Sequence, residues 1–209
     1  MLNGVVGYDF YSRNSRLSRE RIDLNGGVAG SIAFCAVAVN GGFARRQTEL
    51  ANLDLLIANG EQAVKNVETV KRIGAVVGCG APIGFRPFGL IQYEDSRNSA
   101  DLRRGQNVES ITYGGGVEYN QPSIGTIRAF FGARELDFRN RGTALFPGVK
   151  NVRVVAGGVG FRRDIGARLS VDAEVLYAEV QLPGNAGNEF NGLSWRLETK
   201  LRATSALSF

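Results

Sequence analysis

The chain has 209 residues, of which 44% are apolar, and its 25 Lys and Arg against 20 Asp and Glu give a formal net charge of +5. Its 28 glycines exclude a helical bundle, because each glycine inside a helix costs about 1 kcal/mol, and the apolar content excludes a disordered chain. The basic residues are scattered among acidic ones, so we expect no nucleic-acid partner. A chain of this length is expected to form one domain, residues 1–209.

The longest apolar run, Ile32 to Val39, is shorter than the roughly 18 residues that a membrane helix needs. If the chain crosses a membrane, it therefore crosses with strands. Residues 1–10 contain no basic segment followed by an apolar segment, so no signal peptide is visible. An outer-membrane protein needs one, and we expect either that the numbering begins after cleavage or that further strands lie upstream in a longer precursor.

Alternation of apolar and polar residues predicts β-strands along the whole chain. The alternating segments have about the length, roughly 9 to 11 residues, that a tilted strand needs to cross a bilayer. In chain order, the pattern predicts about ten strands, at 5–12, 21–29, 32–45, 67–79, 83–94, 110–119, 126–138, 152–162, 167–181 and 193–209. An even number is typical of bacterial single-chain barrels.

The predicted connections alternate in length. Short turns are expected at 29–31, 80–82, 120–125 and 163–166, and long polar loops at 13–20, 46–66, 95–107, 139–151 and 182–191. Short periplasmic turns and long outer loops are the usual asymmetry of outer-membrane barrels. Clustered Leu and Ile at 50–57 suggest a short helix in one long loop, either as a plug in the lumen or on the outer surface.

The last two segments alternate most clearly. On the final one, an apolar face with Leu193, Trp195, Leu197 and Leu201 continues to Phe209, and only Thr199 and Ser205 interrupt the alternation. The fold that this pattern predicts is an all-β, antiparallel up-and-down transmembrane β-barrel, with the apolar faces toward lipid and the charged faces toward the lumen.

Charged residues on the faces that would turn inward are predicted to line this lumen. They are Arg72, Arg86, Glu118, Arg128, Arg134, Arg168, Asp172, Glu174, Arg196, Glu198, Lys200 and Arg202. The arginines would either attract anions or pair with the acids in a packed interior. Eight strands leave room only for side chains and open channels appear near 16, so about ten strands favour a filled or narrow lumen.

The register of the last hairpin decides which of these charges pair. Symmetric closure near Gly187 sets Glu174 opposite Lys200 and Asp172 opposite Arg202, which would stabilise the strand pair. A shift by one pair sets Glu174 against Glu198 instead.

Cys35 and Cys79 fall near the turn-side ends of adjacent predicted strands. A register with Arg45 opposite Thr69 also sets the two cysteines opposite one another, and an oxidising periplasm permits a disulfide. Because a disulfide needs Cα atoms within about 7 Å and the sequence does not set the register, two free lipid-facing thiols are the favoured interpretation.

Short repeats occur at matching places in the hairpin cycle. The tetrads at 66–69, 107–110 and 151–154 all begin Asn-Val and open a strand, and Ser-Arg-Asn-Ser follows a strand at 12–15 and again at 96–99. Glycine clusters at 114–116 and 157–158 lack the Lys-Ser/Thr of a phosphate loop, so we expect them to relieve crowding in a curved barrel wall.

The chain contains no His, which removes Ser-His and Cys-His pairs and the commonest ligand of zinc and copper. We therefore predict no catalytic residue, cofactor site or metal site. A barrel-embedded hydrolase that uses loop-edge carboxylates such as Asp95 or Asp137 remains a third hypothesis. The second is a soluble lipocalin-type barrel that binds a ligand and turns its apolar face inward.

The hairpin rhythm, the segment Tyr93-Glu94-Asp95-Ser96-Arg97-Asn98-Ser99 and the terminal Phe209 resemble outer-membrane β-barrel porins associated with exopolysaccharide gene clusters. The resemblance implies an outer-membrane location, a lipid bilayer as partner, and a porin-like or export-associated role with a small solute or polysaccharide. A terminal aromatic such as Phe209 also resembles the signal that the outer-membrane assembly machinery recognises. Typical members look longer, which implies a shortened barrel here.

Overall fold

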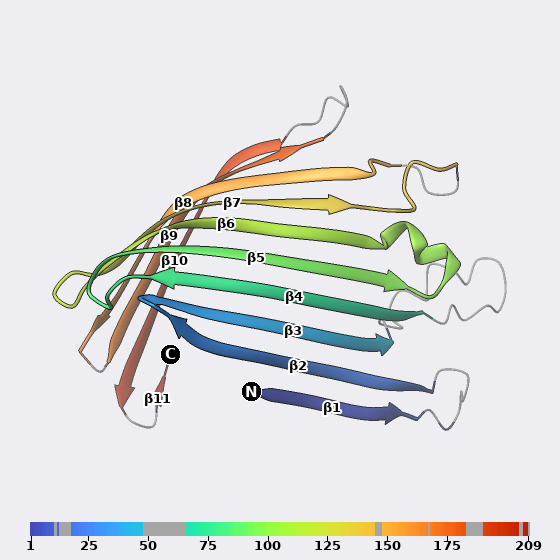
Figure 1. Cartoon of the computed structure of the whole chain (residues 1–209), viewed down its shortest axis with the longest axis horizontal. Helices are drawn as coiled ribbons and strands as arrows, with labels where there is room; N and C mark the ends of the chain where they lie inside the picture. Colours follow the sequence, from blue (N-terminus) through green and yellow to red (C-terminus); the bar gives the residue numbers. More distant parts are fainter. Residues whose placement is uncertain are drawn as a thin grey trace.

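The computed structural model describes residues 1–10, 12, 18–47, 66–144, 148–166, 168–182, 190–204 and 207–208. They form one antiparallel sheet in which each strand pairs with its neighbours in the sequence (Figure 1). The strands are β1 (Leu2–Asp9), β2 (Arg19–Ile32), β3 (Cys35–Gln47), β4 (Val67–Cys79), β5 (Gly84–Asn98), β6 (Val108–Gln121), β7 (Gly125–Asp137), β8 (Asn151–Ile165), β9 (Leu169–Gln181), β10 (Phe190–Thr204) and β11 (Leu207–Ser208). A 3-10 helix, η4 (Asp101–Gln106), connects β5 and β6.

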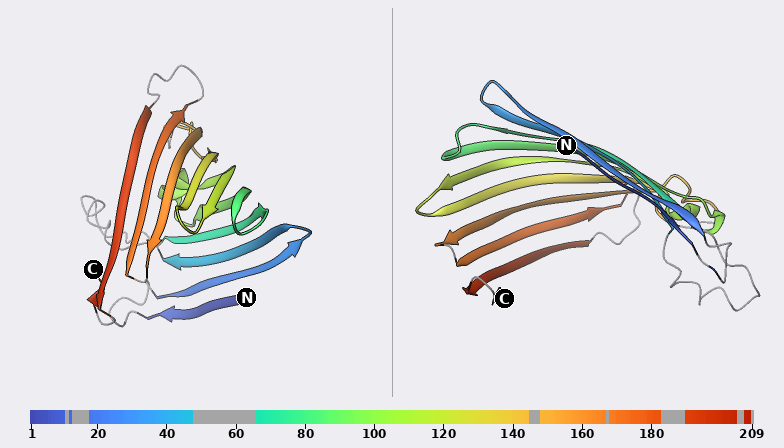
Figure 2. Two further views of the ribbon diagram at one scale, coloured as in Figure 1. Left: turned by 90° about the vertical axis from the view of Figure 1, so that its left-hand side faces the viewer. Right: turned by 90° about the horizontal axis from the view of Figure 1, so that it is seen from below.

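The all-β, up-and-down prediction is confirmed, with ten long strands β1 to β10. The sheet is open, however, and not the predicted closed barrel: no pairing joins β1 to β10 among the described residues. Figure 2 shows the curved sheet as an open trough. β11 pairs with β10 through Arg202 and Thr204, so it takes up part of the edge that closure onto β1 would need.

Short and long connections lie at opposite ends of the sheet, as expected (Figure 1). We call these ends the turn end and the loop end. The predicted turn at 29–31 is wrong, because β2 continues to Ile32 and the chain reverses at Ala33 and Phe34. Ala33 itself takes a left-handed φ of 53°, so the turn does not need Gly30. The 50–57 segment with its expected helix lies outside the described residues.

The last strand is shorter than predicted. β10 ends at Thr204, and Leu207 pairs back onto Thr204, so the expected continuous strand to residue 209 is wrong. Ser205, where the alternation fails in the sequence, lies outside the described residues. Phe209 lies outside the described residues, and its predicted part in assembly stays a prediction.

Cys35 and Cys79 form a disulfide, so the favoured interpretation of two free thiols is wrong. The register of β3 and β4 explains the bond. Arg45 pairs with Thr69, and this same register sets Cys35 directly opposite Cys79, with the Cα atoms 3.9 Å apart. The bond joins β3 to β4 at the turn end of the sheet.

The sheet is a single layer with almost no core. Its accessible surface is 14,729 Å², whereas a folded monomer of 22.5 kDa is expected to expose only about 9,500 Å². Ala133 is the sole buried apolar residue among those described. Because an isolated layer loses the hydrophobic contribution to stability, the side of this sheet that carries the exposed hydrophobic residues requires a covering.

The two faces differ sharply in chemistry, because the pairings of successive strands from β1 through β10 contain no register shift that would mix them. The apolar face is even-numbered on β1 and β2 and odd-numbered on β3 to β10. It carries most of the large exposed hydrophobic side chains, among them Leu2, Val28, Phe85, Phe131, Leu193 and Trp195. The opposite side, the polar face, carries most of the predicted lumen charges.

Glycines mark where the sheet bends. A Cβ at Gly116 would lie 2.1 Å from the carbonyl oxygen of Ala129, and one at Gly158 would lie 2.4 Å from that of Val175. Gly114 is similarly crowded, 2.6 Å from the Phe131 oxygen. All three belong to the polar face. A Cβ at Gly115 on the apolar face would also lie 2.7 Å from the Phe88 oxygen, but the two closest approaches, at Gly116 and Gly158, are on the polar face. Crowding on one side is what bending toward that side produces, in line with the expected use of these glycine clusters.

Candidate functional site

A row of charged residues crosses the polar face from β5 to β10. Residues directly opposite each other on successive strands are, in order, Arg86, Glu118, Arg128, Gly160, Glu174 and Arg196. Except at Gly160, acidic and basic residues alternate along this charged row. Cross-strand pairs of opposite charge stabilise adjacent strands, and the alternation leaves no large field of one sign.

Arg128 pairs with Glu174 across an intervening strand. Its Nη2 atom lies 3.0 Å from Glu174 Oε2, although β8 runs between the two. The residue between them is Gly160, which has no side chain to block the contact. The same arrangement recurs on β2 to β4, where Arg72 reaches over Gly42 and donates a hydrogen bond to Asn25 Oδ1. Glycine therefore provides room for arginines that link alternate strands.

The β9–β10 register differs from both sequence alternatives. Glu174 lies opposite Arg196, and Asp172 opposite Glu198, so the expected Glu174–Lys200 and Asp172–Arg202 pairs are wrong. The like-charged pair is compensated from neighbouring positions. Arg196 lies 3.5 Å from Asp172, and Lys200 lies 2.8 Å from Glu198. A slip by an even number of residues keeps every side chain on its face, so the alternation could not select the register.

The remaining predicted lumen residues are spread more widely. Arg134 and Arg72 lie on the polar face nearer the loop end, and Arg134 is 3.9 Å from Glu94. Arg168 belongs to the turn before β9 and not to a strand, which corrects its predicted place. Arg202 lies in β10, but its side chain is outside the described part.

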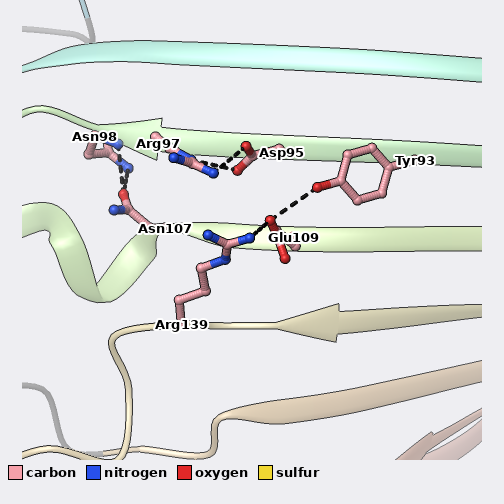
Figure 3. A network of polar contacts seen from close by, with 7 residues as sticks. All are labelled: Tyr93, Asp95, Arg97, Asn98, Asn107, Glu109 and Arg139. Atoms are coloured by element: carbon pink, nitrogen blue, oxygen red, sulfur yellow. Dashed lines mark hydrogen bonds and ion pairs between the residues drawn. The ribbon is translucent and has the colours of Figure 1, made fainter.

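A polar network at the loop end was missed by the sequence analysis (Figure 3). Asn98 is its centre: its Oδ1 accepts a hydrogen bond from Asn66 (2.7 Å), and its backbone N–H donates to Asn107 Oδ1 (2.6 Å). Asn66 and Asn107 are the residues that open two of the repeated tetrads. The first Asn of two repeats thus links the start of β4 and the start of β6 to the end of β5. This shared Asn is the sequence signal from which the network could have been predicted.

On the apolar face of the sheet, the network continues with contacts between tyrosine hydroxyls and charged side chains. Tyr93 donates its hydroxyl to Glu109 (3.0 Å), and Arg139 forms an ion pair with the same carboxylate. Tyr113, Glu135 and Arg153 repeat the arrangement one strand further on. Both groups lie where the apolar face meets the loop end.

The boundary between apolar and charged residues on the apolar face is inclined to the strand pairing. We follow the apolar face of each strand from its middle toward the loop end and note the first charged residue. From β2 to β9 these residues are, in order, Glu20, Arg45, Lys71, Asp95, Glu109, Glu135, Arg153 and Glu179. Through the register, Arg45 is level with Arg97 of β5, whereas Glu179 is level with Ile91, six residues lower on β5. With about 3.4 Å per residue and about 4.8 Å per strand, six residues over the six steps from β3 to β9 give an inclination of about 35°.

The loop-edge carboxylates considered for catalysis lie in one row. Asp95 and Asp137 are both opposite Glu109, on either side of β6. Asp95 is held by Arg97 at 2.9 Å, and Glu109 by Arg139. In the described part of the chain, no group of three or more His, Cys, Asp or Glu has a metal-binding arrangement.

Comparison with known proteins does not assign the chain. No protein-family model matches it, and no match is found among curated proteins. Within the described residues, no helix is both long enough and apolar enough to span a membrane.

Proposed function

We propose that the chain forms the wall of an outer-membrane β-barrel with a porin-like or export-associated role. The inclined boundary on the apolar face carries this proposal. A flat membrane surface cuts tilted strands at successively different residues, and strands of transmembrane barrels tilt by about 35–45°. The inclination of about 35° between Arg45 and Glu179 agrees with such a tilt.

The width of the charge-free band supports the same proposal. On β5 it extends from Phe85 to Tyr93, and Phe85 also packs against Tyr119, with ring centroids 4.8 Å apart. Eight residues at about 3.4 Å, tilted by about 35°, span about 22 Å, close to the roughly 25 Å apolar band of these barrels. Aromatic residues at both limits match the girdles at the two membrane surfaces.

The direction of bending favours this proposal over a soluble lipocalin-type barrel. The crowded glycines place the inside of the bend on the polar face, so closure of the sheet turns the charged row inward. A lipocalin needs the opposite arrangement, with apolar side chains around its ligand. The apolar face then contacts lipid, and Trp195, 74% exposed, lies on it.

Closure requires the free edge of β1 to pair, either with β10 or with a further strand. β1 and β10 are antiparallel in an up-and-down sheet of ten strands, which is the relative direction that closure needs. Because charges alternate along the row, the lumen is expected to accept hydrophilic solutes with little preference for the sign of their charge. In a lumen as narrow as about ten strands allow, a small solute fits this description.

Fluorescence of the single Trp tests the proposal. Purified protein is reconstituted into phosphatidylcholine vesicles with or without bromine on the acyl chains. We expect bromine to quench more than half of the Trp195 emission. A matched variant combines Trp195→Phe with Ser194→Trp, which moves the indole to the polar face; its emission is expected to be quenched by aqueous iodide instead. Protein that stays monomeric in detergent-free buffer and shows no bromine quenching would refute membrane insertion.

A further inference from the structure

An apolar hollow interrupts the polar face between the charged row and the loop end. It has a volume of about 350 Å³ and is lined by Phe88, Leu90, Phe130, Arg128, Arg134 and Ala156, among other residues. This volume is near the lower end of the roughly 300–1,000 Å³ of small-molecule pockets. The hollow is unexpected there, since neighbouring rows of this face carry charges. An apolar depression with a few convergent polar groups is the usual form of a small-molecule site.

The pairing of the strands brings small and apolar residues together at the floor of the hollow. One row across β5 to β8 consists of Leu90, Gly114, Gly132 and Ala156, and all four residues line the hollow. In the next row, Phe88, Gly116, Phe130 and Gly158, only the two phenylalanines line it. Neither row contains a charged residue. Small residues leave the space, and the rings of Phe88 and Phe130 stand beside it, so the hollow can hold an apolar body of limited size.

The two arginines at the rim are not equivalent. Arg128 already has partners within the protein: its Nη2 lies 3.0 Å from Glu174, and its guanidinium lies 5.2 Å from the centre of the Phe130 ring. Arg134 is loosely held: its ion pair with Glu94 is 3.9 Å long, and its hydrogen bond to Ser110 Oγ is 3.4 Å long. Arg134, half exposed beside the hollow, is the cation available to a ligand.

We propose that this hollow binds a small monocarboxylate with an apolar body. The apolar part lies on Gly114 and Gly132, beside Phe88 and Phe130. The carboxylate pairs with Arg134, whose planar guanidinium suits two parallel hydrogen bonds. Glu94 and Glu174 stand near the rim, so a doubly charged anion such as phosphate would be repelled. This binding site goes beyond the proposed passage of hydrophilic solutes through a lumen. It needs only the folded sheet and not insertion into a membrane, so the bromine-quenching experiment does not decide it.

Binding of 4-fluorobenzoate tests the proposal by fluorine NMR. The full chain is held in an amphipathic polymer, because a detergent tail would compete for the hollow. We expect broadening of the fluorine signal by the wild-type protein and at least fivefold weaker binding of 4-fluorobenzyl alcohol, which has the ring without the charge. Excess inorganic phosphate should not displace the probe.

Three variants separate a specific site from adsorption. Arg134→Gln should weaken fluorobenzoate binding at least fivefold without changing the weak binding of the alcohol, and Ala156→Leu should abolish both by filling the hollow. Arg86→Gln, a change on the same face outside the hollow, should leave the affinity within twofold. If Ala156→Leu fails to fold, judged by circular dichroism, Val154→Phe fills the same hollow. Equal binding of acid and alcohol, or undiminished binding to both filled variants, would overturn the proposal.

Discussion

Arg128 on β7 and Glu174 on β9 form an ion pair 3.0 Å long across β8, and the residue beneath the contact is Gly160. Side chains on alternate strands of a sheet stand about 10 Å apart, so only a long side chain over a glycine makes this contact readily. The ion pair and the bend at the crowded glycines have the same requirement. Both need glycine, which has no side chain, at particular positions of the polar face.

Replacing Arg128 with Ala should lower stability modestly. The Arg128 side chain is 45% exposed and that of Glu174 only 18%, so we expect a loss of about 0.5–1 kcal/mol. The loss should shrink in 1 M salt, where screening is strong. Urea unfolding of the single variants and of Arg128→Ala with Glu174→Ala gives the coupling energy. A coupling of zero at low salt would contradict the predicted contribution of the pair to stability.

Gly116 should tolerate substitution far less than Gly30. A Cβ at Gly116 would lie 2.1 Å from a backbone oxygen, which cannot move without opening the bend, whereas nothing lies within 4 Å of a Cβ at Gly30. We expect Gly116→Ala to cost about 2–4 kcal/mol in urea unfolding, or to prevent folding, and Gly30→Ala to change stability by less than about 0.5 kcal/mol. Similar effects of both substitutions would mean that the bend does not depend on Gly116.

The Cys35–Cys79 disulfide should be a main source of stability. It closes a loop with a sequence separation of 44, for which the chain-entropy relation gives about 4 kcal/mol. The Cys35→Ser, Cys79→Ser double variant should therefore unfold at clearly lower urea concentration than the wild type, and dithiothreitol should have the same effect on the wild type alone. Reaction of unreduced wild-type protein with a maleimide would show that the bond is absent.

Sequence alternation predicted most of the strands and their faces, but not all strand ends and not the pairing between strands. β4 has the predicted bounds, Val67–Cys79, and the apolar face of β10 follows directly from Leu193, Trp195 and Leu197. Register is different, because a slip by two residues preserves both faces. For that reason the sequence does not predict that Glu174 lies opposite Arg196 and not opposite Lys200. The same uncertainty of register made the disulfide the less favoured alternative, although the structure contains it. The hollow and the loop-end network needed registers across several strands, which no single segment contains.

Asn98 should hold the loop end together. It accepts a hydrogen bond from Asn66 at 2.7 Å and donates one from its side chain to Asn107 at 3.3 Å, and Asn66 is buried. Removing the amide leaves Asn66 Nδ2 without this acceptor, so we expect Asn98→Ala to cost about 1–2 kcal/mol.

The loss from Asn98→Ala should be local as well as global. Amide hydrogen exchange at the start of β4 and β6 should speed up, while exchange at the turn end of the same strands stays slow, because the disulfide and the ladder remain there. Asn191→Ala is the matched control: Asn191 is exposed and lies at the loop end of β10, so its loss should leave both readouts unchanged. Uniformly faster exchange along β4 in Asn98→Ala would mean that Asn98 supports the whole sheet and is no local clamp.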